Sequence, residues 1–251
     1  MTEKTLSSPT FVELPSAYDR WRRSRLGQIT DALEQDLLLG LIGPMAGLRV
    51  LDVGCGDGQW AITLAKAGAR VYAIDTDSRM LDAARRRFEA EAVEVHLDES
   101  DAKSLPFESE SFDIVTAVTV LCFTREPERA LAEMARVLKP DGRLVIGELG
   151  RDSVWALWRR ARGWLGHTIW RAARFWTAGE LRGLVTTAGL SVATVRAGVF
   201  YPPIGLIAAA LAPLDRWLGR WLVTGGAFLV LVAKKSSDEE SETECSPGLA
   251  Y

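Results

Sequence analysis

Three glycines at alternate positions, Gly54, Gly56 and Gly58, follow a short apolar run at residues 49–53 and precede a helical pattern at 59–67. Glycine lets the backbone turn tightly and lets a ligand approach the main chain. The N-terminus of a helix behind such a turn presents unpaired N–H groups and a partial positive charge. The spacing therefore indicates a site for a polar or anionic ligand, although a strand–turn–helix without a ligand has the same pattern.

An acidic residue, Asp75, stands at the end of the next apolar run, 70–74. It lies about 20 residues beyond the turn, where a carboxylate can accept hydrogen bonds from both hydroxyls of a ribose. The turn and this acid together favour an adenosine cofactor. They do not distinguish NAD from other cofactors of this kind.

Five stretches resemble motifs of the class I methyltransferases that depend on S-adenosylmethionine (SAM). The first is Val-Leu-Asp-Val-Gly-Cys-Gly-Asp-Gly at 50–58, and the others follow in the family's order at 71–75, 101–107, 111–115 and 133–144. The chain is most similar to the small-molecule branch called methyltransferase type 11. The resemblance implies methyl transfer from SAM to a small acceptor, with release of S-adenosylhomocysteine.

The resemblance also implies which residues surround the cofactor. They are Tyr18, Asp52, Gly54, Gly56, Gly58, Asp75, Thr76, Met80, Asp101, Ala102, Val118 and Thr119. The glycines, Val118 and Thr119 would lie along the methionine part, and Asp52 would support the turn or reach the amino group. Asp75 would hold the ribose, Thr76 and Met80 would lie along the adenine, and Asp101 and Ala102 would bind its edge. Tyr18 would cover the cofactor.

The sequence departs from the family pattern at two places. Asp57 stands where Thr or Ser is usual, and Cys122 with Phe123 follows the fourth strand in place of the commoner pairs. The first departure puts any hydroxyl contact at that position in doubt. The second indicates that the substrate-facing segment after the fourth strand differs from that of the commoner family members.

The acceptor side of the site is less clearly marked. Methyl transfer requires the two reactants at near-attack distance, and a general base only if the acceptor must lose a proton. The sequence names no base. Candidates for the acceptor pocket are Cys122, Trp155, His167 and Tyr201. Cys122 could instead be a buried small hydrophobe or a ligand for a soft substrate, and His167 could lie away from the substrate.

The elements that must position these residues alternate between strands and helices. Apolar runs predict strands at 49–53, 70–74, 93–97, 112–118, 143–148, 191–199 and 227–233. Helical patterns occur at 16–41, 59–67, 78–88, 128–138 and 177–188, the last with Thr177 and Glu180 as a capping box. This alternation predicts an α/β fold with a mostly parallel sheet. The resemblance implies a Rossmann-like sheet of seven strands in the order 3-2-1-4-5-7-6, with the last strand antiparallel and helices on both faces.

One domain is expected at residues 16–235, between a flexible arm at 1–15 and a disordered acidic tail at 236–251. Within it, residues 151–176 are rich in Trp and Arg and could form a lid, a membrane-surface element or ordinary packing. Residues 200–224 form an apolar insert. These two segments together suggest an apolar or amphiphilic acceptor.

Composition excludes several classes of protein. The 30 Lys and Arg against 33 Asp and Glu give a net charge of −3, which does not favour binding to nucleic acid. The three cysteines lack metal-ligand spacing, so no metal is expected. Neither a signal peptide nor a membrane-spanning stretch is recognised, which predicts a cytoplasmic protein. Peripheral contact with a membrane stays open, as do two rival functions, a non-catalytic SAM-binding or membrane-peripheral regulator and an NAD-dependent oxidoreductase.

Overall fold

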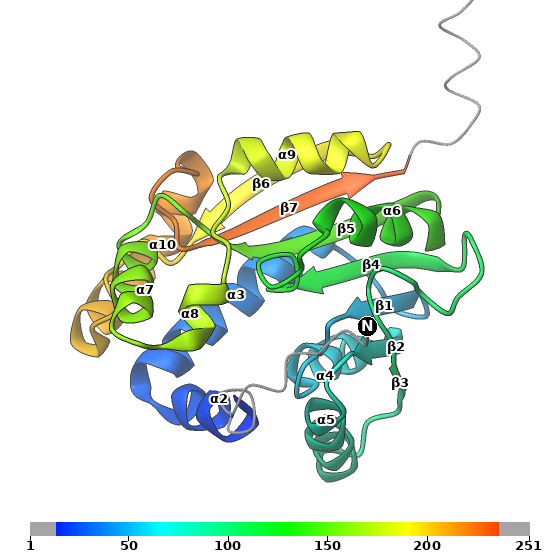
Figure 1. Cartoon of the computed structure of the whole chain (residues 1–251), viewed down its shortest axis with the longest axis horizontal. Helices are drawn as coiled ribbons and strands as arrows, with labels where there is room; N and C mark the ends of the chain where they lie inside the picture. Colours follow the sequence, from blue (N-terminus) through cyan, green and yellow to red (C-terminus); the bar gives the residue numbers. More distant parts are fainter. Residues whose placement is uncertain (1–13, 236–251) are drawn as a thin grey trace, which may run out of the picture.

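The computed structural model describes residues 14–235 (Figure 1). The predictions of a flexible arm and an acidic tail concern residues 1–13 and 236–251, which lie outside the described residues. The first described helix, α2 (Leu14–Arg23), begins two residues inside the stretch assigned to the arm.

A single seven-stranded sheet forms the centre of the molecule, in the order β3-β2-β1-β4-β5-β7-β6. Its strands are β1 (Arg49–Val53), β2 (Arg70–Asp75), β3 (Val95–Glu99), β4 (Phe112–Val118), β5 (Leu138–Leu149), β6 (Ser191–Gly198) and β7 (Phe228–Lys234). Strands β1 to β5 pair in parallel, and β7 runs antiparallel to both β5 and β6. The predicted topology is confirmed.

Helices cover both faces of the sheet, as predicted. On one face, α6 (Pro127–Val137) and α9 (Ala178–Thr187) contribute to a core cluster with the central strands. On the other face, a second cluster includes residues of α3 (Arg25–Ile42), α4 (Gln59–Lys66), α5 (Ser78–Glu91) and α10 (Gly205–Trp221). Because both faces are covered, the central strands are continuous apolar runs rather than alternating ones.

The helical pattern at 16–41 was predicted as one helix, and this is wrong. The chain breaks at Ser24 into α2 and α3, because the Ser24 side chain accepts a hydrogen bond from Gly27 N at 3.1 Å and caps the second helix. Ser24 Oγ also donates to Trp21 O at 2.6 Å, which ends the first helix.

Smaller differences concern element ends. Strand β3 begins two residues later than expected. Strand β5 begins at Leu138 rather than at residue 143, because Leu138 already pairs with Phe112 of β4 before the register of the two strands shifts. The capping box at Thr177 is confirmed, with Glu180 N donating to Thr177 Oγ1 at 3.2 Å and Thr177 N donating to Glu180 Oε2 at 2.8 Å.

The Trp- and Arg-rich segment forms two helices, α7 (Val154–Trp164) and α8 (Thr168–Ala172). Helix α10 occupies the apolar insert between β6 and β7. In Figure 1, α7 and α10 lie at the same end of the molecule, on the left of the view. No helix within residues 14–235 is both long enough and apolar enough to cross a membrane.

Candidate functional site

The glycine-rich turn lies at the carboxyl end of β1, and all three glycines have positive φ angles, 67° at Gly54, 56° at Gly56 and 80° at Gly58. They are needed for different reasons. A Cβ on Gly54 would lie 2.6 Å from the side chain of Val120, and one on Gly58 would lie 2.5 Å from Phe88. A Cβ on Gly56 would have nothing within 4 Å. Two glycines therefore serve packing, and Gly56 faces open space.

Asp75, at the end of β2, fixes the turn from the neighbouring strand. Its carboxylate accepts hydrogen bonds from Gly56 N at 2.8 Å and from Asp77 N at 2.9 Å. Burial raises the pKa of Asp75, and the backbone hydrogen bonds oppose this effect. Each carboxylate oxygen keeps an acceptor site beyond these bonds, so the group can also receive two hydroxyl donors.

Asp52 is buried beneath the turn on β1. Its Oδ1 accepts from Thr116 Oγ1 at 2.9 Å, and its Oδ2 is buried without a hydrogen-bond partner. Burial, together with the nearby charge of Asp75, raises the pKa of Asp52 to about 7. A buried acceptor without a partner is unusual in a folded protein and marks a place where a donor from a ligand could be received.

The remaining residues expected around the cofactor lie at the same edge of the sheet, where the parallel strands end. Thr76 and Asp101 are exposed after β2 and β3, Met80 is buried on α5, and Ala102, Val118 and Thr119 are half-buried. Thr119 N donates to Gly147 O at 2.7 Å, which continues the sheet one residue past β4. Tyr18 lies on α2 with 42% of its surface exposed. Topology thus brings the predicted set to one edge, which is where ligands bind in open α/β sheets.

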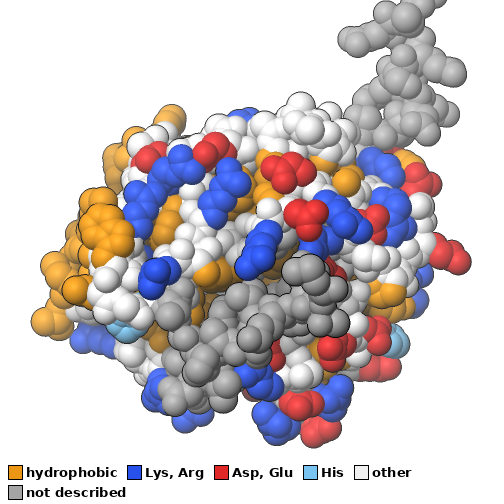
Figure 2. Space-filling view, in the orientation of Figure 1, with side chains coloured by type: hydrophobic (Ala, Val, Ile, Leu, Met, Phe, Trp, Pro, Cys, Tyr) orange, Lys and Arg blue, Asp and Glu red, His pale blue; other side chains and the backbone are white. Residues whose placement is uncertain are grey.

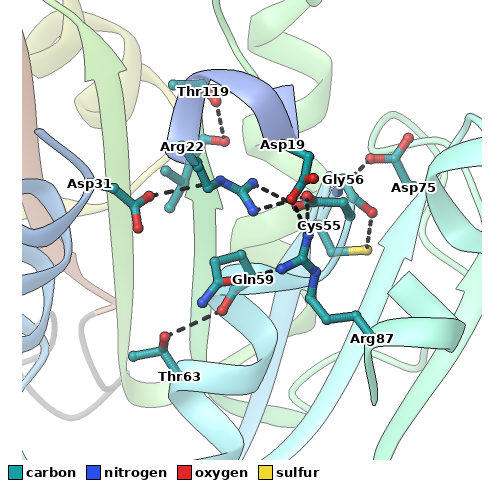
Figure 3. A network of polar contacts seen from close by, with 12 residues as sticks. Asp19, Arg22, Asp31, Cys55, Gly56, Gln59, Thr63, Asp75, Arg87 and Thr119 are labelled. Carbon is teal, nitrogen blue, oxygen red and sulfur yellow. Dashed lines mark hydrogen bonds and ion pairs between the residues drawn. The ribbon is translucent and has the colours of Figure 1, made fainter. Parts of the chain in front are cut away.

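A buried ion-pair network around Asp57 joins α2 to the glycine-rich turn, and Figure 3 shows its two arginines, Arg22 and Arg87, converging beside the turn. Arg22 of α2 donates two hydrogen bonds to the Asp57 carboxylate, at 2.9 and 2.7 Å, and Arg87 of α5 donates a third at 2.9 Å. Arg87 also donates to Gln59 Oε1 at 3.0 Å. The Arg22 guanidinium lies 4.4 Å from the ring centroid of Tyr18. The sequence showed Asp57 only as a departure from Thr or Ser, and this network is its structural explanation.

Arg159 of α7 is the most unusual side chain on the acceptor side. It is only 8% exposed, and within residues 14–235 it forms no ion pair or hydrogen bond. Its guanidinium lies 4.9 Å from the ring centroids of both Trp155 and Trp170. Burial lowers the pKa of Arg159, and the neighbouring Glu34 opposes this most. A buried cation held on aromatic rings can receive an anionic or carbonyl oxygen.

Glu34 of α3 is half-buried and lies close enough to Arg159 for the two charges to shift each other's pKa, without an ion pair between them in the described part of the chain. Burial raises the pKa of Glu34 to about 8, while the positive charge of Arg159 opposes the shift. A carboxyl group with a pKa near neutrality is suited to accept a proton. Neither Glu34 nor Arg159 could be recognised from the sequence, since many Glu and Arg residues occur in helical patterns and only packing shows which of them lie close together.

The four candidates for the acceptor pocket have different surroundings. Trp155 and Tyr201 are buried and joined, because Trp155 Nε1 donates to Tyr201 O at 2.8 Å, and the Tyr201 hydroxyl pairs with Thr30 Oγ1 at 2.9 Å. Cys122 is 2% exposed, and burial and Glu148 raise its pKa, so it is a neutral thiol. His167 is exposed and contacts Arg162 at 3.0 Å. Among the described residues, no cluster of His, Cys, Asp and Glu could hold a metal ion.

Glu148, on β5, is a further buried carboxyl that the sequence did not reveal. Its Oε1 accepts from Leu121 N at 2.7 Å, and its Oε2 is buried without a partner. Burial raises its pKa to about 7. The hydrogen bond from Leu121 N holds the segment that follows β4 in place, and this segment carries Cys122.

Comparison with known proteins agrees with this geometry. Residues 51–146 match a family model described as a methyltransferase domain. A demethylmenaquinone methyltransferase of Clavibacter sepedonicus is 40% identical over 147 residues, covering 59% of each chain. A ubiquinone biosynthesis O-methyltransferase of Cereibacter sphaeroides is 32% identical over 187 residues, covering 71% of this chain and 75% of the relative.

Solved structures give the same result for the whole fold. A SAM-dependent methyltransferase from Thermotoga maritima, described as a possible histamine N-methyltransferase, has a TM-score of 0.69 and 25% identity, and the match covers 90% of this chain and 98% of that one. The chain spans only 49–59% of the length of three curated relatives that it matches. The family model and the sheet topology agree with the Cereibacter sphaeroides relative, which this chain covers over 75% of its length. The chain therefore belongs to the class I SAM-dependent methyltransferases, enzymes with SAM as their cofactor.

Proposed function

We propose that this enzyme methylates a small, apolar or amphiphilic acceptor that carries an ionisable hydroxyl on an aromatic or quinol-type ring. The observation that carries the proposal is Arg159, a buried guanidinium that lies against two indole rings and within the electrostatic influence of the Glu34 carboxyl. Apolar walls suit a ring, and the cation suits the oxygen that the ring bears. The names of two relatives, for demethylmenaquinone and ubiquinone biosynthesis, support a quinone-type acceptor.

The described residues fit SAM. Gly56 leaves open space in front of the turn, Asp75 keeps acceptor sites for the ribose hydroxyls, and Asp52 has a free buried oxygen for a donor. We assign cofactor binding to the set expected from the sequence, with Tyr18 covering the methionine part from α2. When bound, SAM supplies a methyl group already activated by a sulfonium.

The residues of the chain then have three tasks in the proposed reaction. Glu34, as the carboxylate, takes the hydroxyl proton from the acceptor. Arg159 stabilises the negative charge that this leaves on the acceptor oxygen. Trp155 and Trp170 hold the ring and exclude water. The activated oxygen, or a ring carbon that shares its charge, forms the new bond to the methyl carbon as the bond from that carbon to sulfur breaks.

Methyl transfer to matched acceptors tests this proposal. The purified enzyme is incubated with SAM and a series of quinols and phenols with and without an apolar tail, together with amines and thiols of similar size. Mass spectrometry should find a mass gain of one methylene on the hydroxyl-bearing rings. Methylation confined to amines or thiols would reject the acceptor class and leave the enzyme class intact.

A variant of Arg159 and a matched control variant test the role proposed for this residue. Arg159→Gln should lower kcat/KM by about 100-fold or more, because a charged hydrogen bond to the developing oxyanion is lost. Arg160→Gln, the neighbouring change on α7, is the matched control and should leave turnover close to that of the parent enzyme. SAM binding should be retained in both variants.

The same measurements distinguish the two rival functions. A non-catalytic SAM-binding protein would show no turnover with any acceptor, and an NAD-dependent oxidoreductase would bind NADH.

A further inference from the structure

Helix α10 packs against the protein with its small side chains and exposes its large ones. The buried positions are Ala208, Asp215 and Gly219. The exposed apolar positions are Leu206, Ile207, Leu211, Leu214, Trp217 and Trp221, with Trp221 76% exposed and Leu206 74% exposed. At about 100° per residue these six side chains form one stripe along the helix. A row of exposed apolar side chains on a surface helix is typical of a site that binds a partner.

A second set of exposed apolar side chains continues this surface on α7. Leu157, Trp164 and Leu165 are 64%, 87% and 84% exposed, and Val154 and Trp158 lie beside them on the same element. Figure 2 shows hydrophobic side chains gathered along the left edge of the molecule, where α7 and α10 lie in Figure 1. We refer to the exposed apolar side chains of residues 154–165 and 204–222 as the α7–α10 surface.

Arginine predominates among the charged residues of this region, although the whole chain is acidic. Residues 151–176 contain six arginines, of which Arg159 is buried, and one acidic residue, the exposed Asp152, against a net charge of −3 for the chain. On α10, Arg220 is exposed, Arg216 is exposed and paired with Asp36 of α3, and Asp215 is buried and accepts hydrogen bonds from Val199 N at 2.8 Å and Phe200 N at 2.7 Å. The positive charge is therefore concentrated around the apolar side chains.

A surface cavity of about 510 Å³ borders the α7 side of this region. Its lining includes Arg151, Arg160, Arg171 and Arg174, with Trp164 and Trp170. Arg151 is paired with Glu180 at 2.7 Å, and the guanidinium of Arg160 lies 5.3 Å from the ring centroid of Phe175. Arginines with aromatic neighbours are suited to receive a phosphate group.

We propose that the α7–α10 surface docks on an anionic lipid bilayer. The apolar side chains would enter the region between headgroups and acyl chains, the tryptophans would lie at the headgroup level, and the arginines would contact lipid phosphates. A second copy of the chain fits less well, since a two-fold symmetric contact would place these arginine clusters against each other.

The proposed docking places α7 between the bilayer and the acceptor site. Its buried side carries Trp155 and Arg159, and its exposed side carries Leu157 and Trp164. An amphiphilic acceptor could therefore reach Arg159 from the membrane. The docking itself rests only on the exposed surface, and it can be tested without knowledge of the acceptor.

Vesicle co-sedimentation with the full chain tests the proposal. The protein should bind vesicles that contain phosphatidylglycerol, bind pure phosphatidylcholine vesicles much more weakly, and dissociate as salt is raised. The double variant Trp217→Ser with Trp221→Ser should weaken binding by about tenfold or more. Arg171→Gln with Arg220→Gln should weaken binding to the anionic vesicles by about 30-fold. Arg85→Gln with Arg86→Gln, on α5, removes the same charge elsewhere and should bind like the parent protein.

Several results would overturn the proposal. Failure to bind anionic vesicles would reject it, and binding that survives the Trp217 and Trp221 changes would reject this surface. Light scattering that finds a dimer in the parent protein and a monomer in the tryptophan variant would assign the surface to a second copy. SAM binding, measured by calorimetry, should be equal in all variants, so that loss of the fold or of the proposed function is distinguished from loss of docking.

Discussion

Among single side chains, Asp75 fixes the glycine-rich turn, and we propose that it also binds the ribose hydroxyls of SAM. Asp75→Asn replaces one acceptor oxygen by a donor, which conflicts with the N–H groups of Gly56 and Asp77. We expect the Kd for S-adenosylhomocysteine to rise by about 10- to 100-fold, as measured by isothermal titration. Asp98→Asn, at an exposed position on β3, is the control. An unchanged Kd in the Asp75 variant would remove this residue from the cofactor site.

The ionisation of Glu34 should control how the rate of methyl transfer depends on pH. Burial raises its pKa to about 8, so the carboxylate that can accept a proton becomes the main form only above that pH. We expect kcat/KM of the parent enzyme to rise with pH and level off above about 8. Glu34→Gln should lower the rate by about 100-fold or more and abolish this rise. A rise that persists in the variant would assign the base to another group.

The chemistry of the cofactor side could be predicted from the sequence, and that of the acceptor side could not. The glycines, Asp52 and Asp75 belong to one continuous strand–turn–helix–strand unit, in which spacing alone determines position. Arg159 and Glu34 lie on helices that are distant in the chain, and the roles proposed for them depend on how these helices pack together. His167, chosen for its type, is exposed beside Arg162.

At the scale of elements, the central strands were predicted well because they are apolar runs bounded by turns, whereas the bounds of the edge strand β3, Val-His-Leu-Asp-Glu, shifted by two residues. The break within the predicted first helix lies where a side chain competes with the backbone, as Ser24 does between α2 and α3. The position of α2 over the turn was also hidden, since it depends on Arg22 reaching Asp57 across 35 residues of sequence. Predictions at this scale therefore concern how α2 is attached.

Removing the Asp57 carboxylate should loosen α2. The side chains of Arg22 and Asp57 are only 13% and 6% exposed, so Asp57→Ser leaves two guanidinium groups without their buried partner. We expect faster proteolytic cleavage near residues 14–24 and an approximately tenfold weaker affinity for SAM. Lys66→Gln breaks the exposed pair with Glu91 and should change neither property. Equal protease resistance in the Asp57 variant would contradict an attachment through this network.

On the scale of the whole molecule, the buried carboxyl groups of Asp52 and Glu148 and the half-buried one of Glu34 should make stability depend on pH. Burial raises the pKa to about 7 for Asp52, about 7 for Glu148 and about 8 for Glu34. Between the unfolded and folded pKa values the native state binds more protons than the unfolded state, so the free energy of unfolding falls as pH rises. This stabilisation is fully present below about pH 4 for these groups and is lost as pH rises through 7 to 8.

Thermal unfolding checks this expectation. The Tm should fall between pH 6 and pH 9. Over this range each group should lower the free energy of unfolding by at most about 1.4 kcal/mol per pH unit. Glu34→Gln should make the fall shallower and should be more stable than the parent protein at pH 9. A Tm that rises over this range would show that other groups control stability.

The attachment of α2 through Asp57 also has a kinetic consequence. Asp57 belongs to the turn itself, so the carboxylate that holds α2 is fixed to the main chain that we assign to cofactor binding. Exchange of S-adenosylhomocysteine for SAM would then require α2 to open, and product release rather than chemistry would limit turnover. A rapid-mixing experiment should reveal a burst of methylated product in the first turnover, followed by a slower steady state. In Asp57→Ser the burst should shrink because the slow step becomes faster.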